Sequence, residues 1–250
     1  YKDISNMKNF SIILSTIAVI LATASLVCTF KCKTANTAGS ANVSVEEALK
    51  ANPKMVMDAL QAYQTQQQEA QRKAAEEALT KYIPEINSSA NAPFVGPEDA
   101  KVTVVEFFDF SCHYCKRLAP ALEEVMAKNS DVKFVFKPLS FVDPQGSHYQ
   151  AQAALALYKQ GKFLEFYKAV MAAEGRMNKE AVDNIAKGLN IDFDKYKADV
   201  DAAEVNSNLD ELSNLAQKIQ VNGVPTVIIN GKHVQTMRAE DLQAAIDEAK

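Results

Sequence analysis

The chain has 250 residues, of which 48% are hydrophobic, and its formal net charge is −4. This hydrophobic content is sufficient for one domain of ordinary size with accessory segments, and it excludes a disordered chain. Beyond residue 40 the acidic side chains outnumber the basic ones, and the net charge of that part is about −7. The balance excludes the basic face that a nucleic-acid-binding protein requires.

Residues 1–33 are predicted to direct export from the cytoplasm. Residues 10–30 contain no charged side chain, and a lysine stands close to each end of this run. The small residues Ala-Thr-Ala at positions 22–24 are typical of a signal-peptide cleavage site, whereas the length of the run also suits an N-terminal membrane anchor. Ser and Thr residues within the run favour the signal peptide. Both alternatives predict a periplasmic or other extracytoplasmic location, where disulfides persist.

Residues 34–92 are predicted to form a tether and a helical arm. The first part of this segment is small and polar, and a helical pattern with a thin apolar stripe follows. Part of this stripe follows a degraded heptad seam, which indicates self-association. We therefore expect a homo-oligomer formed through residues 44–83. The alternative is a solvated helix that lies on the following domain. The degraded heptad seam consists of six positions: Val56, Leu60, Tyr63, Gln67, Ala70 and Ala74.

Cys112 and Cys115 stand where an apolar strand pattern over residues 102–108 meets an amphipathic helix pattern that begins at Cys115. Two thiols three positions apart on the first turn of a helix face the same way, within reach of a disulfide. The helix N-terminus favours negative charge, so the Cys112 thiol should ionise easily. A disulfide across two residues removes little chain entropy, which favours redox chemistry over a structural role. Cys28 and Cys32 belong to the export segment, and we assign them no chemistry.

Glu106 lies within the predicted strand. Because side chains alternate along a strand, Glu106 shares one face with Val102, Val104 and Phe108. A carboxyl buried on that face would have a raised pKa and would exchange a proton near neutral pH. The alternative is an edge strand from which Glu106 reaches solvent.

The rest of the chain is predicted to alternate between strands and helices. Aromatic residues of the long helical region, among them Phe163, Phe166 and Tyr167, repeat at helical spacing and are interpreted as core. The remaining elements are, in chain order, a strand at 132–138, a helical insertion at about 146–220, a hairpin at 224–234 with its turn at Asn230-Gly231, and a helix at 238–249.

Two motifs carry a resemblance to a known family. Residues 106–115 read Glu-Phe-Phe-Asp-Phe-Ser-Cys-His-Tyr-Cys, and Val224-Pro225-Thr226 follows about 110 residues later. With the order of elements, these motifs resemble the DsbA-like thioredoxin family over residues 93–250. The resemblance implies an α/β thioredoxin fold with a helical insertion, preceded by an N-terminal helical arm. It also implies that Pro225 is cis beside the reactive thiol, in a loop that pairs with the substrate backbone, and that Glu106 is the buried proton acceptor for Cys115.

Residues around the cysteines are predicted to tune their chemistry. The best-known oxidants of the family have Pro and then His between the cysteines, whereas this chain has His113 and then Tyr114. His113 is predicted to donate a hydrogen bond or add positive charge to the Cys112 thiolate, and either would lower the pKa of that thiol. Each pKa unit is worth about 1.4 kcal/mol, or about 30 mV in a two-electron couple. Phe110, Tyr114 and Val224 are predicted to form an apolar lip for unfolded substrates.

The motifs and the resemblance predict a thiol-disulfide oxidoreductase that introduces disulfides into exported, cysteine-containing polypeptides through Cys112 and Cys115. A membrane redox partner would recycle the pair, and we expect no cofactor and no metal ion. The first alternative is a multimeric isomerase or reductase that uses the same pair, because ScsC-like relatives also have N-terminal helical arms. Val224 favours the oxidase, since the isomerases usually have Thr there. The second alternative is a non-enzymatic metal-binding or chaperone-like exported protein.

Overall fold

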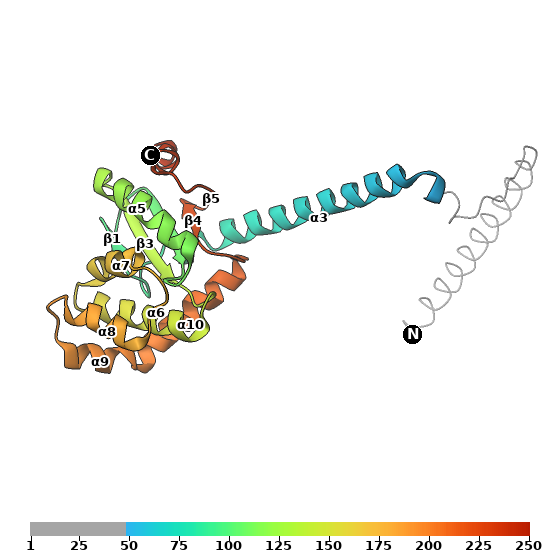
Figure 1. Ribbon diagram of the computed structural model, residues 1–250. Helices are drawn as coiled ribbons and strands as arrows, with labels where there is room; N and C mark the ends of the chain where they lie inside the picture. Colours follow the sequence, from blue (N-terminus) through green and yellow to red (C-terminus); the bar gives the residue numbers. More distant parts are fainter. Residues whose placement is uncertain (1–48) are drawn as a thin grey trace, which may run out of the picture. The chain divides into compact units, whose positions relative to one another are not determined.

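The computed structural model describes residues 49–250 (Figure 1). The predicted export segment at residues 1–33 and the first part of the tether lie outside the described residues. From residue 49 to the C-terminus, no helix is both long enough and apolar enough to cross a bilayer. The signal peptide and the anchor both stay predictions. Residues 65–250 form one compact unit, and its architecture is described here.

Within residues 49–250 the protein has one mixed sheet of five strands in the order β1-β3-β2-β4-β5. The central strand β2 is parallel to β3 and antiparallel to β4, while β1 and β5 close the two edges in antiparallel pairs. Every residue of β2 and β3 is buried, because both faces of the sheet are covered. The strands are β1 (Phe94–Val95), β2 (Thr103–Phe108), β3 (Lys133–Pro138), β4 (Thr226–Ile229) and β5 (Lys232–Val234).

The segment between β3 and β4 contains helices and no strand, as the sequence predicted for the insertion. Its first helix begins at Pro144, because the Asp143 side chain accepts a hydrogen bond from the Gly146 amide and caps the helix. The helices are α3 (Pro53–Lys81), α4 (Ile83–Asn87), α5 (His113–Lys128), α6 (Pro144–Tyr158), α7 (Phe163–Ala172), α8 (Lys179–Lys187), α9 (Phe193–Val200), α10 (Ala203–Lys218) and α11 (Ala239–Ala249).

The start of α5 differs from the prediction by one half-turn. The helix begins at His113 instead of Cys115, and Cys112 is the N-cap residue with an extended backbone. The amide of Lys116 donates to the carbonyl oxygen of Cys112 at 3.0 Å, which is the first hydrogen bond of the helix. Both cysteines therefore lie at the N-terminal end of α5, where the unpaired backbone amides point toward negative charge.

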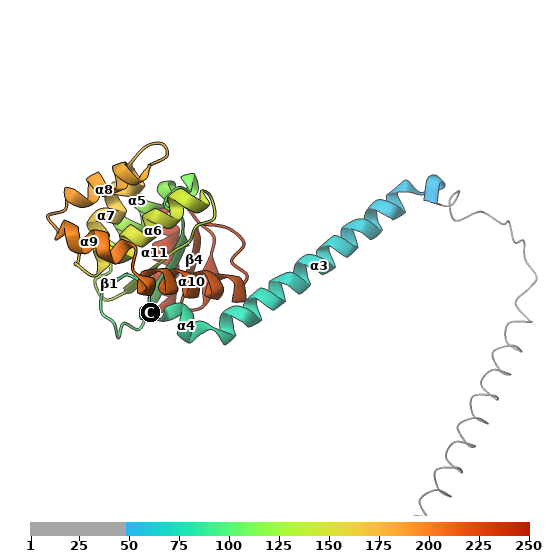
Figure 2. The ribbon, with the colours of Figure 1, turned by 90° about the horizontal axis from the view of Figure 1, so that it is seen from below.

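The two faces of the sheet pack into two separate cores. Alternation along β2 directs Val104 and Phe108 into a core with α5, α7 and α11, and directs Val105 and Phe107 into a second core with α4 and α10. Figure 2 shows α10 on the opposite side of the sheet from α5. Glu106 shares the first face, as predicted. Because β2 lies between β3 and β4, the alternative of an edge strand is wrong.

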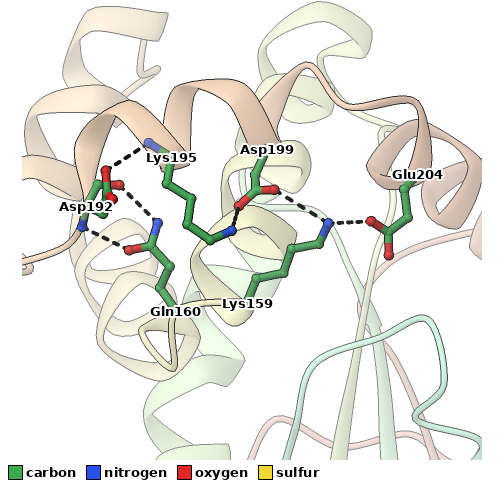
Figure 3. Close-up of polar contacts among 6 residues, drawn as sticks. All are labelled: Lys159, Gln160, Asp192, Lys195, Asp199 and Glu204. Atoms are coloured by element: carbon green, nitrogen blue, oxygen red, sulfur yellow. Dashed lines mark hydrogen bonds and ion pairs between the residues drawn. The ribbon is translucent and has the colours of Figure 1, made fainter.

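Polar contacts fasten the helices of the insertion to one another at the surface (Figure 3). Lys159, at the end of α6, forms ion pairs with Asp199 of α9 at 3.7 Å and with Glu204 of α10 at 2.5 Å. Nearby, Gln160 and Asp192 exchange two hydrogen bonds, of 2.9 and 3.0 Å. Exposed pairs of this kind contribute little individually. Together they join the end of α6 to α9 and α10.

A tight hairpin joins β4 to β5. Asn230 and Gly231 both have positive φ, 45° and 83°, as a two-residue turn of this kind requires. The Asn230 side chain accepts from the Thr103 amide at 2.8 Å, so the turn is tied to the beginning of β2. The predicted hairpin is confirmed, and it places the Val224–Thr226 segment beside the opposite end of β2.

Candidate active site

Cys112 and Cys115 differ sharply in their access to solvent. Cys112 is the N-cap of α5 and keeps 6% of its surface exposed, whereas Cys115, one turn further, is completely buried. Neither forms a disulfide, so the structure represents the dithiol form of the pair. An incoming sulfur can therefore reach Cys112 far more easily than Cys115.

The surroundings of Cys112 stabilise its thiolate. The Cys115 thiol donates a hydrogen bond to it, and the backbone amides of Cys115 and Tyr114 add two further donors; together they lower the pKa of Cys112 to about 6 despite partial burial. Burial and the neighbouring Cys112 have the opposite effect on Cys115 and raise its pKa well above the ordinary value. The pair thus consists of an ionised outer sulfur and a protonated inner one.

His113 was predicted to tune Cys112. Its side chain is exposed, and its ring meets the Tyr114 ring edge to face at 6.0 Å between centroids. The donors that lower the pKa of Cys112 are the Cys115 thiol and backbone amides at the start of α5. Tuning by His113 stays a prediction, and the largest contribution to the low pKa of Cys112 comes from the Cys115 thiol, followed by the helix amides.

The loop before β4 lies against the reactive sulfur. The peptide bond between Val224 and Pro225 is cis, and the Cys112 thiol lies 3.5 Å from the Val224 carbonyl oxygen, to which it can donate. The Thr226 hydroxyl donates to the Gly223 carbonyl at 2.8 Å and closes the loop. The cis proline beside the thiol, which the family resemblance implied, is confirmed.

Glu106 lies on the same face of β2 as the core around Cys115 and is only 2% exposed. Burial raises its pKa to about 8, although a hydrogen bond of 3.0 Å from the Tyr167 hydroxyl to Oε2 opposes the shift. The charge of Glu106 also helps to raise the pKa of Cys115. A carboxyl in this state can give or take a proton near neutral pH.

Asp109 is a residue of this region to which the sequence assigned no role. It is completely buried, and its Oδ1 accepts from the Ser111 amide at 2.7 Å and the Ser147 hydroxyl at 2.6 Å. Its Oδ2 accepts from the amides of Phe141 and Val142, both at 2.8 Å. One carboxylate therefore joins the loop before Cys112 to the loop after β3. Its only sequence signal is a charged residue between two aromatic residues.

Phe110 does not contribute to a lip around Cys112, and this prediction is wrong. Its side chain is 1% exposed and packs edge to face against Phe108 and Phe166 in the core. Phe110 lies in the same core as Val104 and Phe108, on the side of the sheet that α5 and α7 cover. Tyr114, by contrast, is 59% exposed.

A groove of about 620 Å³ runs beside the cis-proline loop. The lining of the groove includes Tyr114 and Leu118 of α5 and Val224 and Pro225 of the loop. The groove lies near the reactive sulfur, because Val224 lines it and the Val224 carbonyl oxygen approaches Cys112. Two of the three residues predicted to form the apolar lip, Tyr114 and Val224, therefore line this groove.

Comparison with known proteins gives the family. Residues 88–248 match a family described as Thioredoxin. The chain is 30% identical over 167 residues to "Probable disulfide bond formation protein D" of Bacillus anthracis, covering 62% of this chain and 76% of that protein. It is also 31% identical over 157 residues to the Na⁺/H⁺ antiporter NhaA 1 of Salinispora arenicola, of which the match covers 24%. The chain thus spans about a quarter of the antiporter.

Solved structures agree with this result. A thioredoxin-like oxidoreductase from Silicibacter pomeroyi is 33% identical, with a TM-score of 0.61 and coverage of 66% of this chain and 95% of the other. A variant of Proteus mirabilis ScsC shares the fold at 23% identity, with a TM-score of 0.68 and coverage of 84% and 98%. The chain belongs to the thioredoxin superfamily, and within it to the DsbA-like oxidoreductases.

Proposed function

We propose that this protein introduces disulfides into exported, cysteine-containing polypeptides through Cys112 and Cys115. One observation carries the proposal: an ionised sulfur at a helix N-terminus, the less buried of the two, is paired with a protonated, fully buried sulfur one turn further. A stabilised Cys112 thiolate favours the reduced form of the pair, and the disulfide form is correspondingly a stronger oxidant. The names of the relatives that match over most of their length support the same chemistry.

The reaction starts from the Cys112–Cys115 disulfide. A substrate thiolate attacks Cys112, which forms a mixed disulfide and releases Cys115 as a thiolate; the Glu106 carboxylic acid supplies the proton that Cys115 then takes. A second substrate thiolate attacks the substrate sulfur of the mixed disulfide. This step forms the substrate disulfide and releases Cys112 as a thiolate. The substrate loses two electrons, and the pair gains them.

The cis-proline loop and the adjacent groove would hold the substrate during this exchange. Val224, Pro225 and Thr226 present backbone to an extended chain beside Cys112, and Tyr114 offers an exposed aromatic surface. A membrane redox partner would then withdraw two electrons from the dithiol and restore the disulfide. An extracytoplasmic location belongs to the same proposal, because the predicted export segment at residues 1–33 precedes the domain.

The second candidate function keeps the site and reverses the direction of electron flow. A multimeric isomerase or reductase would hold Cys112 reduced and would use residues 44–83 for assembly. The exposed apolar side chains of the predicted seam on α3, Leu60 and Tyr63, favour assembly of copies. The low pKa of Cys112 supports the oxidase. It stabilises the dithiol product, so the disulfide form readily takes electrons from a substrate.

The redox state of the pair in intact cells distinguishes the two functions. Cells are quenched with acid, and free thiols are alkylated with a reagent of known mass before electrophoresis. An oxidase keeps Cys112 and Cys115 largely as a disulfide, whereas an isomerase or reductase keeps them as thiols. Purified disulfide-form protein should also oxidise a peptide with two cysteines, and Cys112→Ser should abolish that activity. Failure of the wild-type protein to exchange with any thiol would contradict both functions.

A further inference from the structure

The hydroxyl of Tyr167 is a polar group inside an aromatic cluster. The residue belongs to α7 in the insertion and is completely buried, with ring centroids 5.4 Å from Phe108 and 4.9 Å from Phe136. Phenylalanine would fill this space without burying an oxygen, and a buried hydroxyl is costly unless it forms a hydrogen bond. The Tyr167 hydroxyl donates to Glu106 Oε2 at 3.0 Å. The insertion thus supplies a donor to the buried carboxyl of the sheet.

The contact leaves the two oxygens of Glu106 in different states. Oε2 is held by Tyr167, whereas Oε1 is buried and has no hydrogen-bond partner among residues 49–250. A buried polar atom without a partner is unusual and calls for a role. Oε1 is the oxygen that remains free for a proton, a water molecule or a thiol.

Few other titratable groups act on Glu106. From α5, Cys112 and Cys115 are coupled to it electrostatically, and Glu123 acts on Tyr167. The lysines of β3, Lys133 and Lys137, lie on the opposite face of the sheet, because they alternate with Phe134 and Phe136 of the first core. The strand neighbours of Glu106 on β3 and β4 are Phe136 and Val227. Tyr167 is therefore the only hydrogen-bond donor to Glu106 among the described residues.

We propose that Tyr167 is a positioning residue that fixes Glu106 and sets the pH range in which this carboxyl exchanges a proton with Cys115. The inference rests on the proposed function. When Cys115 leaves as a thiolate, the Glu106 acid gives up its proton to that sulfur, and the resulting carboxylate keeps the hydrogen bond from Tyr167. No proton leaves the phenol. The bond stabilises the carboxylate more than the acid and so opposes the effect of burial.

The test follows the rate at which excess glutathione reduces the Cys112–Cys115 disulfide as pH is raised. Rates are divided by the thiolate fraction of glutathione, and samples are quenched with acid and alkylated for mass spectrometry, since the chain has no tryptophan to serve as a fluorescent probe. In the wild-type protein the corrected rate should fall as Glu106 loses its proton. In Tyr167→Phe this fall should move to higher pH by about one unit, because a hydrogen bond to the charged form is lost.

Two variants show whether Tyr167 acts through Glu106. Glu106→Gln should abolish the pH-dependent fall in the corrected rate. The double variant with Tyr167→Phe should have the same flat profile. Tyr196→Phe is the matched control, because Tyr196 is also completely buried in the insertion but donates to Asp183 at 2.9 Å. It should leave the pH profile unchanged.

Biosynthetic incorporation of fluorotyrosine provides a test that leaves the fold intact if Tyr167→Phe does not fold. A more acidic phenol strengthens the bond to the carboxylate, so the fall should move to lower pH, and the movement should vanish in Glu106→Gln. An unmoved profile in Tyr167→Phe, or a shift that persists without Glu106, would overturn the inference while the protein still exchanged disulfides. A wild-type disulfide that glutathione cannot reduce would instead contradict the proposed function.

Discussion

The sulfur of Cys112 lies 3.5 Å from the carbonyl oxygen of Val224, a residue 112 positions further along the chain. This contact places the less buried sulfur of the pair beside the cis-proline loop, which also lines the groove. A substrate chain bound along that loop would present its own sulfur to Cys112 and not to the buried Cys115. Five predictions about the site and the helical arm can be measured.

The Cys112 thiol should ionise with a midpoint near pH 6, because hydrogen bonds from the Cys115 thiol and the helix amides stabilise the thiolate. The thiolate absorbance in the ultraviolet, followed from pH 4 to pH 9 in the reduced protein, measures this directly. Cys112→Ser should lose the transition, whereas Cys115→Ala, which removes the side-chain donor, should keep it at a higher pH. A wild-type midpoint near the ordinary value of about 8.5 would contradict the proposed activation.

Cys115→Ala should accumulate mixed disulfides between Cys112 and substrate proteins. Resolution of the mixed disulfide by Cys115 is then impossible, and the intermediate lives longer. Extraction of acid-quenched cells and non-reducing electrophoresis reveal the trapped species, and mass spectrometry identifies them. The Cys112→Ala, Cys115→Ala double variant is the control and should trap nothing. Equal yields from both variants would show that the captured proteins do not bind through Cys112.

Glu106→Gln should make the protein more stable than wild type at alkaline pH. The folded-state pKa of Glu106 is raised from the ordinary 4.5 to about 8, so the folded protein holds this proton more tightly than the unfolded chain. The stability that the proton provides is complete below pH 4.5 and is lost as pH rises to about 8, by up to about 5 kcal/mol. Denaturant unfolding at pH 5 and pH 8.5 measures the difference. An equal effect of the substitution at both pH values would contradict the raised pKa.

Asp109→Asn should destabilise the protein by about 2–4 kcal/mol. The carboxylate accepts four hydrogen bonds, and an amide nitrogen in the position of Oδ1 or Oδ2 would face donors instead of accepting from them. The loss of a negative charge should also lower the pKa of Cys112 further. Asp143→Asn is the control, because Asn caps a helix as well as Asp does. Similar stability losses in both variants would argue against a special role for Asp109.

Leu60→Glu should reduce the sedimentation mass if α3 assembles copies of the chain. Leu60 belongs to the predicted seam and is 51% exposed, so the substitution introduces charge into the proposed interface without removing core contacts. Met57→Glu, at an exposed position off the seam, is the control. Deletion of residues 44–83 is a poorer test, because it removes Leu79, which packs in the second core. A mass of one chain for the unsubstituted protein would exclude assembly through α3.

The sequence by itself determined the order of the elements from β2 onward, the helical insertion, the hairpin and the position of the cysteine pair, whereas it did not indicate the short strand β1. Each of these depends on local signals: a hydrophobic period, an Asn-Gly turn, or two thiols on one helical turn. Alternation along β2 also predicted correctly that Glu106 shares a face with Val104 and Phe108. The cis proline followed from the family resemblance.

Only the tertiary structure decided what surrounds these groups. The partner of Glu106 is Tyr167, 61 residues away on a helix where its ring was interpreted as core, and Asp109 accepts from Ser147, 38 residues away. Phe110 lies inward because Phe166 of α7 packs against it on the side of the sheet that Phe108 also faces. Hydrogen-bond partners and packing at such separations depend on how helices dock on the sheet. Periodicity along the chain carries no information about that docking, because it records only which face each element buries.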